Sequence, residues 1–560
     1  MTLTSNNRTL TPIALALCTL CSGAWAQTPP DAGRVLRDLQ QTPVLTTPQG
    51  APLQPTDSAP GVSSASDAKV FVKSITITGN RELPAATLEG LVSNLIGTEQ
   101  TLSQLDAATQ RITAYYRAQG FAVARAYLPA QDIKDGALTI GIIEGRIANY
   151  KINNKSLLSD EAANAYFDQI KDGDVIRSAQ IDRGLLLLQD TPGVAASRAT
   201  LQPGASVGTS ELLIEIDPAR TFNGNLAIDN YGSRYTGEYR LGGAFNIASP
   251  LNIGDQISLT ALSSGDQLTY ARLAYQAPVG SSGLRLGAAY FDTRYKLGKE
   301  FAALDAHGTA TSTSLFAAYP FIRSQLQNLS GTLSFESKHL NDQVGATATI
   351  TDKRVRLTGL GLAGNLQDTW LGGGINSFDL NVALGRLSIN SPGALAIDAV
   401  SAQTNGGYTR VSYSLGRLQR ITDGALLSVT LNGQQASKNL DSSEKYSLGG
   451  VNGVRAFPQG EASGDEGYRV TFELQQALTS NLQATLFYDL GEITINKSPF
   501  GPPAANSRNL AGVGIGLNAS YSGIQLRGSL AWRTDGGLPT SIPASAARRP
   551  TLWLQGQMGF

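Results

Sequence analysis

An arginine on an unusually apolar loop, followed by two carboxylates, offers the best chance of a specific interaction in this sequence. Arg455 stands in the run Val454-Arg455-Ala456-Phe457, within a tract, 437–465, that would otherwise be a solvated surface loop. Glu473 and Asp489 lie on the next two alternating segments of the chain. A guanidinium group is a planar fork of donors that can bridge two carboxylates through charge-assisted hydrogen bonds. The alternative is a solvated arginine and two acids that only line a wet surface.

Other kinds of chemistry find little support. Cys18 and Cys21 both lie in the first 26 residues, and His307 and His339 are far from any metal-ligand spacing. The glycine pattern Gly359-x-Gly361-x-x-Gly364 falls inside an expected strand rather than before a helix. Lys+Arg and Asp+Glu both total 44, so the bulk charge favours no polyanionic partner such as nucleic acid. We therefore predict a protein that is not an enzyme and that uses no metal, nucleotide or other cofactor.

The N-terminus has the pattern of an export signal. Arg8 supplies a positive charge, 13–20 forms an apolar core too short to span a bilayer, and Ala24-Trp25-Ala26 is a small-x-small cleavage pattern. Residues 1–26 are therefore predicted to be a removed signal peptide. Beyond them no apolar run is long enough for a spanning helix, so any passage through a membrane must be made by strands.

A short helix and a tether are expected next, over 27–42 and 43–68. The helix should run from Asp31, a suitable N-cap, to Gln41. The tether is rich in Pro, Ser, Thr and Ala and carries almost no charge. A frayed exported tail is the alternative for the helix. Its apolar side would consist of Val35, Leu36 and Leu39.

Two small modules with the same element order, strand, helix, helix, strand, strand, are predicted over 69–146 and 147–218. Gly120-Phe121 of the first aligns with Gly193-Val194 of the second, which gives a repeat of about 75 residues. Their sheet edges could receive an extended segment by strand addition, or the modules could be spacers. The expected elements are 70–78, 84–96, 104–119, 122–128 and 137–143 in the first module, and 147–152, 160–171, 178–190, 194–201 and 211–216 in the second.

Residues 219–560 change to glycine-rich segments of alternating polarity, which favours a transmembrane β-barrel of about sixteen antiparallel strands. The connections alternate between short and long, as periplasmic turns and outer loops do, and the chain ends on Phe560. The expected strands are 222–231, 235–248, 254–264, 268–277, 283–295, 309–321, 328–341, 348–366, 375–388, 406–420, 424–436, 466–478, 481–491, 509–521, 523–533 and 550–560.

Strand parity gives the two acids a direction. In 467–475 the apolar set faces outward and the polar set, which includes Glu473, faces inward. Asp489 has inward parity on the next strand. If the loop 437–465 folds back into the barrel, Arg455 can reach both carboxylates. The outward set is Tyr468, Val470, Phe472 and Leu474, and the inward set is Arg469, Thr471, Glu473 and Gln475.

These motifs carry a family resemblance. The run 454–457 is similar to the VRGF/Y loop motif of the superfamily of outer-membrane assembly and secretion barrels, and Phe487-Tyr488-Asp489-Leu490-Gly491 is similar to its F-x-D-x-G strand motif. The two modules resemble POTRA domains, and the short helix resembles the family's plug helix. The order of signal peptide, short helix with linker, two modules and sixteen-stranded barrel resembles that of the two-partner secretion transporters, which export haemolysins and filamentous-haemagglutinin-like adhesins. The resemblance covers essentially the whole mature chain. Ala456 departs from the family's usual glycine.

The resemblance implies an outer-membrane translocator with periplasmic POTRA domains. It would capture an unfolded partner exoprotein, adhesin-like or haemolysin-like, and export it through the barrel to the cell surface by type V secretion. Its interactions would be with that client and with outer-membrane lipid, not with nucleic acid or nucleotide. An assembly factor that inserts other outer-membrane proteins and, more remotely, a passive porin are the alternatives.

Overall fold

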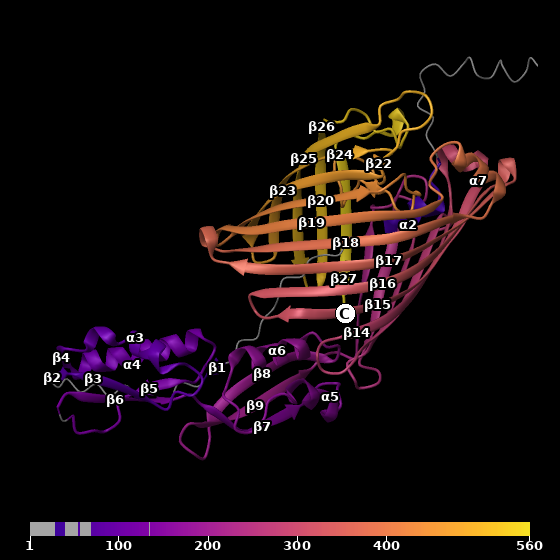
Figure 1. Ribbon diagram of the computed structural model, residues 1–560. Coiled ribbons are helices and arrows are strands. Elements are labelled where there is room, and N and C mark those ends of the chain that lie inside the picture. The colour runs from indigo at the N-terminus through magenta and orange to yellow at the C-terminus, as the bar shows by residue number, and fades with distance from the viewer. Residues whose placement is uncertain (1–28, 40–53, 56–68, 134) are drawn as a thin grey trace, which may run out of the picture.

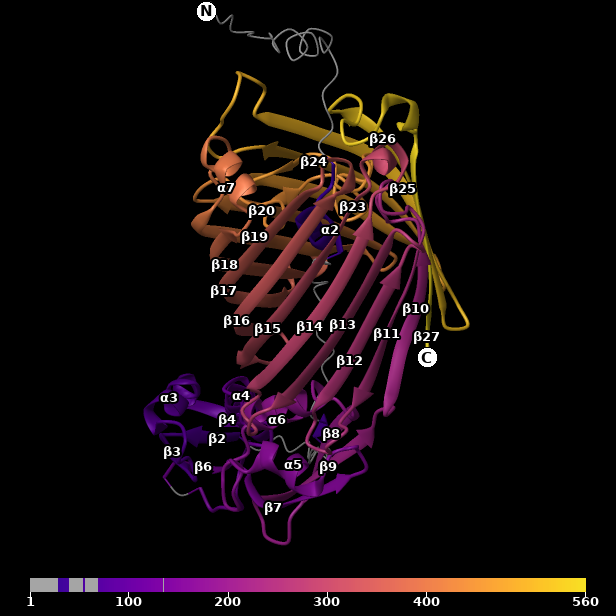
Figure 2. The same ribbon diagram turned by 90° about the vertical axis from the view of Figure 1, so that its right-hand side faces the viewer.

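The computed structural model describes residues 29–39, 54–55, 69–133 and 135–560 (Figure 1). The predicted signal peptide lies outside the described residues, as does the predicted tether apart from 54–55. In the described part of the chain, no helix is both long and apolar enough to cross a membrane. Two small modules lie below one end of a large barrel (Figures 1 and 2).

The first module packs two helices against short strands. Its sheet has the order β3-β6-β5, and β2 pairs separately with β4. A capping box begins α4, since Thr101 Oγ1 accepts from Gln104 N at 3.3 Å and Gln104 Oε1 accepts from Thr101 N at 2.8 Å. The elements are β2 (Lys69–Val72), β3 (Ser74–Thr78), α3 (Ala85–Gly90), β4 (Thr98–Thr101), α4 (Leu102–Ala118), β5 (Arg125–Tyr127) and β6 (Ala137–Ile143).

Two details differ from expectation here. The expected strand 70–78 is interrupted at Lys73, which separates β2 from β3, and β4 occupies a segment expected to be a connection. The break lets β2 pair with β4 while β3 pairs in parallel with β6. The expected helix 84–96 ends at Gly90 and is followed by a single 3₁₀ turn.

The second module repeats the arrangement with longer strands. Strands β8 and β9 pair antiparallel, β9 and β7 pair in parallel, and β1 (Gln54–Pro55) pairs in parallel with β8. Helix α6 lies over this sheet and buries Ile181, Leu185 and Leu188 in the module core. The elements are β7 (Arg146–Asn154), α5 (Asp160–Asn164), α6 (Ser178–Gln189), β8 (Val194–Pro203) and β9 (Thr209–Pro218).

Sixteen strands of the described residues close into a barrel in which each strand pairs antiparallel with the next along the wall, which confirms the predicted fold class. Figure 2 shows the strands strongly tilted, as closure of a barrel requires. The strands are β10 (Phe222–Asp229), β11 (Arg240–Ala248), β12 (Gln256–Ser263), β13 (Leu268–Pro278), β14 (Arg285–Lys296), β15 (Ala306–Arg323), β16 (Gln327–Val344), β17 (Thr349–Asp368), β18 (Gly374–Ile389), β19 (Gly406–Thr422), β20 (Ala425–Ala436), β23 (Glu466–Thr479), β24 (Leu482–Thr494), β25 (Ser507–Tyr521), β26 (Ile524–Asp535) and β27 (Thr551–Gly559).

The alternating pattern sorts side chains between lipid and lumen. On the outer wall, Leu273, Leu315 and Leu486 are each more than half exposed, which suits a surface in contact with lipid tails. The glycine pattern 359–364 belongs to β17. A Cβ at Gly364 would lie 2.7 Å from the ring of Phe378 on the neighbouring strand, so this glycine relieves crowding in the wall. His307, which falls between the expected strands 283–295 and 309–321, is the second residue of β15.

The second module is tied to the barrel end by arginines of the wall. Arg323 forms a bidentate pair with Asp190, with Nε–Oδ2 at 2.6 Å and Nη2–Oδ1 at 2.8 Å. In the opposite direction, Arg183 of α6 donates to the carbonyl of Pro320 at 2.9 Å. These contacts fix the module beneath the barrel end that carries the short turns. The long loops lie at the other rim, and so does α7 (Pro392–Ala399), a helix in the connection between two of the expected strands (Figure 2).

Candidate functional site: a loop and a helix inside the barrel

The loop between β20 and β23, residues 437–465, folds into the barrel instead of projecting from it. It contains a small hairpin of β21 (Tyr446–Ser447) and β22 (Ser463–Gly464). Its apolar residues form a core with the wall strands, and Phe457 is fully buried. The members of this core are Leu448, Val454, Ala456, Phe457, Phe487, Ile493, Leu510 and Ala531.

At the tip of this loop, Arg455 meets both predicted carboxylates. Its Nε donates to Asp489 Oδ2 at 2.8 Å and its Nη2 to Asp489 Oδ1 at 2.9 Å, while Nη1 donates to Glu473 Oε2 at 2.7 Å. The Asp489 side chain is 1% exposed and that of Arg455 15%. The guanidinium also stacks on Phe487, with Cζ 3.4 Å from the ring centre. Three groups on β23 and β24 therefore hold one arginine.

Backbone contacts hold the tip as well. The amide of Arg455 donates to Asp489 Oδ2 at 3.1 Å. On the opposite side, Trp553 Nε1 donates to the carbonyl of Arg455 at 2.7 Å, and Thr551 Oγ1 to the carbonyl of Ala456 at 2.9 Å. The tip therefore bridges β24 and β27, the last strand before the barrel closes.

Glycines on the wall make room for the loop. A Cβ at Gly491 would lie 2.5 Å from Leu448 Cδ1, so this position of the strand motif needs a glycine for close packing. A Cβ at Gly512 on β25 would collide with the Cβ of Ala456. Ala456 does not adopt a positive φ, so its departure from the glycine of the motif costs no backbone strain. Gly512 supplies the space for the extra methyl group.

The fit between the small residues Ala456 and Gly512 can be tested by exchanging alanine and glycine between the two positions. Gly512→Ala should destabilise the folded barrel by about 1–3 kcal/mol, because it overpacks the loop contact. Adding Ala456→Gly should restore most of that loss. The readout is the temperature at which the folded band disappears in a gel-shift assay of the detergent-solubilised barrel. Gly361→Ala on β17 is the control, since a Cβ there meets neighbours only at 3.4 Å and beyond. Additive losses in the double variant would contradict the pairing.

Four further carboxylates of the loop are buried and paired, and their partners could not be predicted from local sequence patterns. Asp441 binds Lys353 of β17 at 2.7 Å, and Glu444 binds Lys338 of β16 at 2.8 Å and Arg410 of β19 at 3.0 Å. The remaining two are Glu461, which binds Arg508 of β25 and accepts from Thr540 N at 2.8 Å, and Asp465, which binds Lys445 at 2.6 Å.

A short helix, α2 (Ala32–Leu39), occupies the lumen beside this loop (Figures 1 and 2). Val35 and Leu36 are buried in a cluster with residues of many strands, and Leu39 packs against its edge. The expected helix extended to Gln41, but residues 40 and 41 lie outside the described part of the chain. The wall residues in this cluster include Leu268, Phe291, Tyr295, Leu340, Val355, Leu387 and Tyr408.

Polar contacts join the helix to both the loop and the wall. Asp31 Oδ2 accepts from Ser442 Oγ at 2.6 Å and from Lys353 Nζ at 3.2 Å. Arg34 Nη2 donates to the carbonyl of Gly460 at 2.9 Å, and Arg37 Nη1 to Ser463 Oγ at 2.5 Å. Lys353 is shared, because it also binds Asp441 of the loop. The helix is thus held between the loop and the β16–β17 wall.

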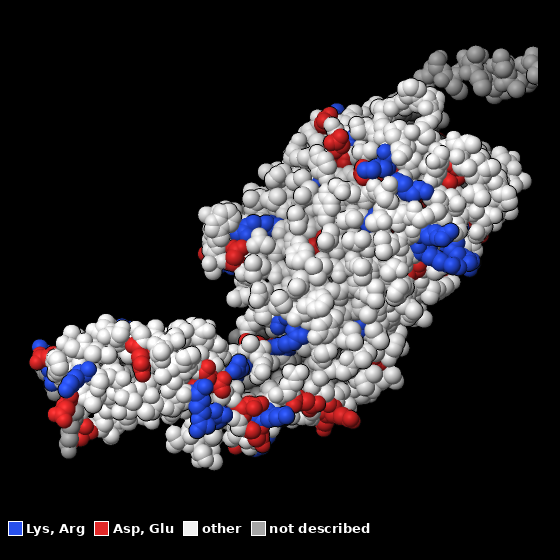
Figure 3. Space-filling view, viewed as in Figure 1, with Lys and Arg blue, Asp and Glu red and all other residues white. Residues whose placement is uncertain are grey.

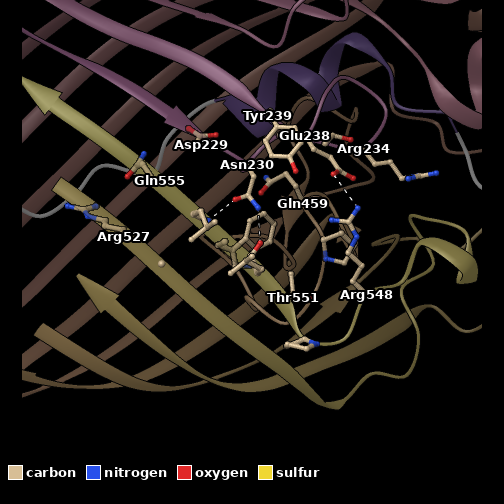
Figure 4. A pocket seen from close by; sticks show the side chains of 18 of the residues that line it. Asp229, Asn230, Arg234, Glu238, Tyr239, Gln459, Arg527, Arg548, Thr551 and Gln555 are labelled. Carbon is tan, nitrogen blue, oxygen red and sulfur yellow. Dashed lines mark hydrogen bonds and ion pairs between the residues drawn. The ribbon is translucent and has the colours of Figure 1, made fainter. Parts of the chain in front are cut away.

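A cavity of about 770 Å³ lies beside the helix at the junction of β27 and β10 (Figure 4). Arg34 of α2 and Gln459 of the loop reach it from the lumen. The two strands pair over only five residues, 225–229 with 555–559. Above that stretch the contact is continued by Asn230, whose side chain bonds the backbone of Leu552 and Leu554.

Among the residues described, no group of three or more His, Cys, Asp or Glu side chains could hold a metal ion. His339 Nε2 is hydrogen-bonded to Asp352 at 2.5 Å, and His307 Nδ1 to the carbonyl of Asp305 at 2.8 Å. The arrangement of Arg455 and its partners can hold a loop in place.

Comparison with known proteins identifies the family. The family described as Haemolysin secretion/activation protein ShlB/FhaC/HecB matches residues 208–519, which is more than half of the chain. The chain belongs to this family. A ShlB-type POTRA domain also matches residues 70–145, the first module. This ShlB/FhaC/HecB family is one of transporters rather than enzymes.

Individual relatives agree with this assignment. The heme/hemopexin transporter protein HuxB of Haemophilus influenzae is 30% identical over 88% of this chain and 89% of its own. The outer membrane transporter CdiB of Dickeya dadantii is 24% identical over 86% of this chain and 82% of its own. Among solved structures, CdiB from Escherichia coli superposes with a TM-score of 0.71 at 18% identity, covering 91% of this chain and 94% of that one.

The ShlB/FhaC/HecB assignment carries the predicted function with it. The protein is an outer-membrane transporter of the two-partner secretion type, with its barrel in the outer membrane and its POTRA domains in the periplasm. Its client is a secreted exoprotein, which favours export over the assembly of membrane proteins.

Proposed function

We propose that α2 and the loop 437–465 together close the barrel at rest, and that export begins when the helix leaves the lumen. One observation carries this proposal: α2 is wedged between the loop and the wall, and its hydrogen bonds run to both. Loss of the helix removes bonding partners from Ser442, Gly460 and Ser463 of the loop and from Lys353 of the wall at the same time. Departure of the plug and release of the loop are therefore linked.

Arg455 acts in this scheme as a latch. It fixes the loop tip to β23 and β24, while the tip carbonyls accept from β27. When the loop residues that contact α2 lose those contacts, Arg455 keeps the tip of the loop in its position on the wall. A bidentate pair in a site of limited water is suited to this task, because it holds orientation as well as position.

The client enters as an extended chain captured by the modules. Strands β5 and β7 stand at sheet edges in the strand order of the two modules, and such edges accept an additional strand through backbone hydrogen bonds. Backbone capture suits an unfolded client, since it requires no folded surface. Binding here and folding outside the cell supply the direction of transport, without a nucleotide.

A cargo related to haem or hemopexin acquisition is the first to test. Identity to the heme/hemopexin transporters is 28–30% over 88% of the chain, against 23–24% for the CdiB transporters. An exoprotein encoded beside this chain should appear in the medium only when the transporter is co-produced. The measurement is an immunoblot of medium and periplasm. Accumulation of the client in the outer membrane, rather than outside the cell, would contradict export and favour an insertion role.

A further inference from the structure

Three arginines on the outer wall of the barrel have no bonding partner among the residues that the structure describes. On β17, Lys353 and Val355 are buried in the lumen, whereas Arg354 and Arg356, which alternate with them, are exposed. On β18, Leu387 is buried inside and its neighbour Arg386 is exposed. By strand parity the three guanidinium groups therefore point outward, on the face that meets the membrane.

Register brings the three together. Arg356 and Arg386 are direct cross-strand partners, and Arg354 follows on the same face of β17, opposite Ser388 on one side and His339 on the other. Side chains directly opposite in an antiparallel pair have Cβ atoms about 5 Å apart, and like charges placed so are destabilising. The wall thus carries a concentrated positive charge at a cost to its own stability.

Nothing in the described chain relieves this charge. The three guanidinium groups make no hydrogen bond or ion pair with any described residue. The nearest carboxylate on this face of β17 is Asp352, and it is engaged by His339 Nε2 at 2.5 Å and by Asn390 Nδ2 at 2.5 Å.

The height of the cluster matches a membrane interface. Arg356 lies twelve residues along β17 from Asp368 at the end that faces the modules. At about 3.3 Å per residue and a tilt of about 40°, that distance is about 30 Å along the barrel axis, the thickness of a bilayer core. Below the cluster the outward residues are apolar, among them Leu360, Leu384 and Phe335, which are 50–53% exposed. Figure 3 shows a block of Lys and Arg on this part of the wall.

We propose that Arg354, Arg356 and Arg386 bind the phosphate groups of an anionic lipid in the outer leaflet of the membrane. Arginine binds phosphate through two parallel hydrogen bonds, and three adjacent guanidinium groups suit a head group that carries more than one phosphate. The apolar residues below them accommodate the acyl chains, and Ser337 and Ser388, exposed on the same face, add hydroxyl donors. A phosphorylated glycolipid such as lipid A has this chemistry. The bound lipid neutralises the charge that the wall leaves unmatched.

Native mass spectrometry of the full chain in detergent, with added lipid A, tests the proposal. Wild type should retain lipid A, and the variant Arg354→Gln/Arg356→Gln/Arg386→Gln should bind it about tenfold less tightly or worse, a loss of about 1.4 kcal/mol or more. Binding to wild type should fall when the phosphates are removed from the lipid. Arg356→Gln alone should give an intermediate loss of affinity for lipid A. This single variant keeps the test decisive if the triple variant does not fold.

The matched control is Arg294→Gln/Lys296→Gln. These two residues are exposed on β14 at the same rim, but each has a carboxylate partner, Asp292 at 3.2 Å and Asp305 at 2.9 Å. Equal loss in this control would show a general effect of positive charge and would overturn the site. Undiminished binding in the triple variant would do the same. Equal affinity for inorganic phosphate alone would overturn the assignment to lipid.

Discussion

Replacing Arg455 with alanine should reduce export about tenfold or more while the barrel still assembles. The substitution leaves Asp489, 1% exposed, and Glu473 without their cation, and removal of one partner of a buried ion pair costs about 3–5 kcal/mol. The wall pairing of β23 with β24 does not depend on the arginine, so insertion should survive. The measurement is secreted exoprotein per unit of folded transporter in the outer membrane. Export by Arg455→Lys should lie between that of wild type and that of Arg455→Ala, since an ammonium group keeps the charge but cannot form the bidentate contact.

Arg417→Ala is the matched control for that experiment. Arg417 also forms a bidentate contact, with Asp368 at 2.8 and 3.2 Å, but it lies at the end of the barrel that faces the modules. Its loss should leave export unchanged. A double-mutant cycle of Arg455→Ala with Asp489→Ala, read as heat stability of the folded barrel, should show coupling. Normal export by a well-inserted Arg455→Ala protein would refute the latch.

Removing residues 31–41 should raise the single-channel conductance of the barrel in planar bilayers. The helix fills the lumen with Val35 and Leu36, so its deletion opens a path that water and ions can enter. Gly33→Val should act in the same direction with one substitution. A Cβ at this position would lie 2.7 Å from the backbone N of Ser443 and would collide with Ser442, so the helix can no longer seat against the loop.

Gly393→Val serves as the control for the helix variant. Gly393 is also a helical glycine, in α7, and a Cβ there meets no atom within 4 Å. The single-channel conductance of the Gly393→Val barrel should equal that of wild type. If deletion of the helix leaves conductance unchanged, the loop alone closes the lumen and α2 is not the plug.

The barrel could be predicted from the sequence because its strands follow a period of two. For the contacts of Arg455, strand parity showed only that they were possible, and the resemblance of 454–457 and 487–491 to the two family motifs favoured them over a solvated arginine. Parity alone directed Glu473 and Asp489 inward, and the apolar residues beside Arg455 indicated that the loop is not solvated. The partners of Asp441 and Glu444 could not be predicted from the sequence. Lys353 and Lys338 lie about a hundred residues away from them along the chain, and only the closed geometry of the barrel brings them close.

Two short elements, β4 and α7, were not predicted from the sequence, for a different reason. Strand β4, Thr98–Thr101, has no apolar alternation and runs directly into α4, so only its pairing with β2 reveals it. Helix α7 is eight residues long and has Pro392 at its start, a signal that a long loop can also carry. In both cases tertiary pairing or packing decides the structure, and local sequence does not.

The buried acids of the loop also determine the electrical character of the lumen. With the loop in place, Lys338, Lys353, Arg410 and Arg508 are paired with its carboxylates, and Arg455 is paired with Glu473 and Asp489. If the loop swings away, β16, β17, β19 and β25 expose cations while β23 and β24 expose anions. The vacated channel would then carry a strip of negative charge on β23 and β24, with cations of β16, β17 and β19 on one side of it and of β25 on the other. A passing polypeptide of mixed charge meets groups of both signs around the wall and is held tightly by neither.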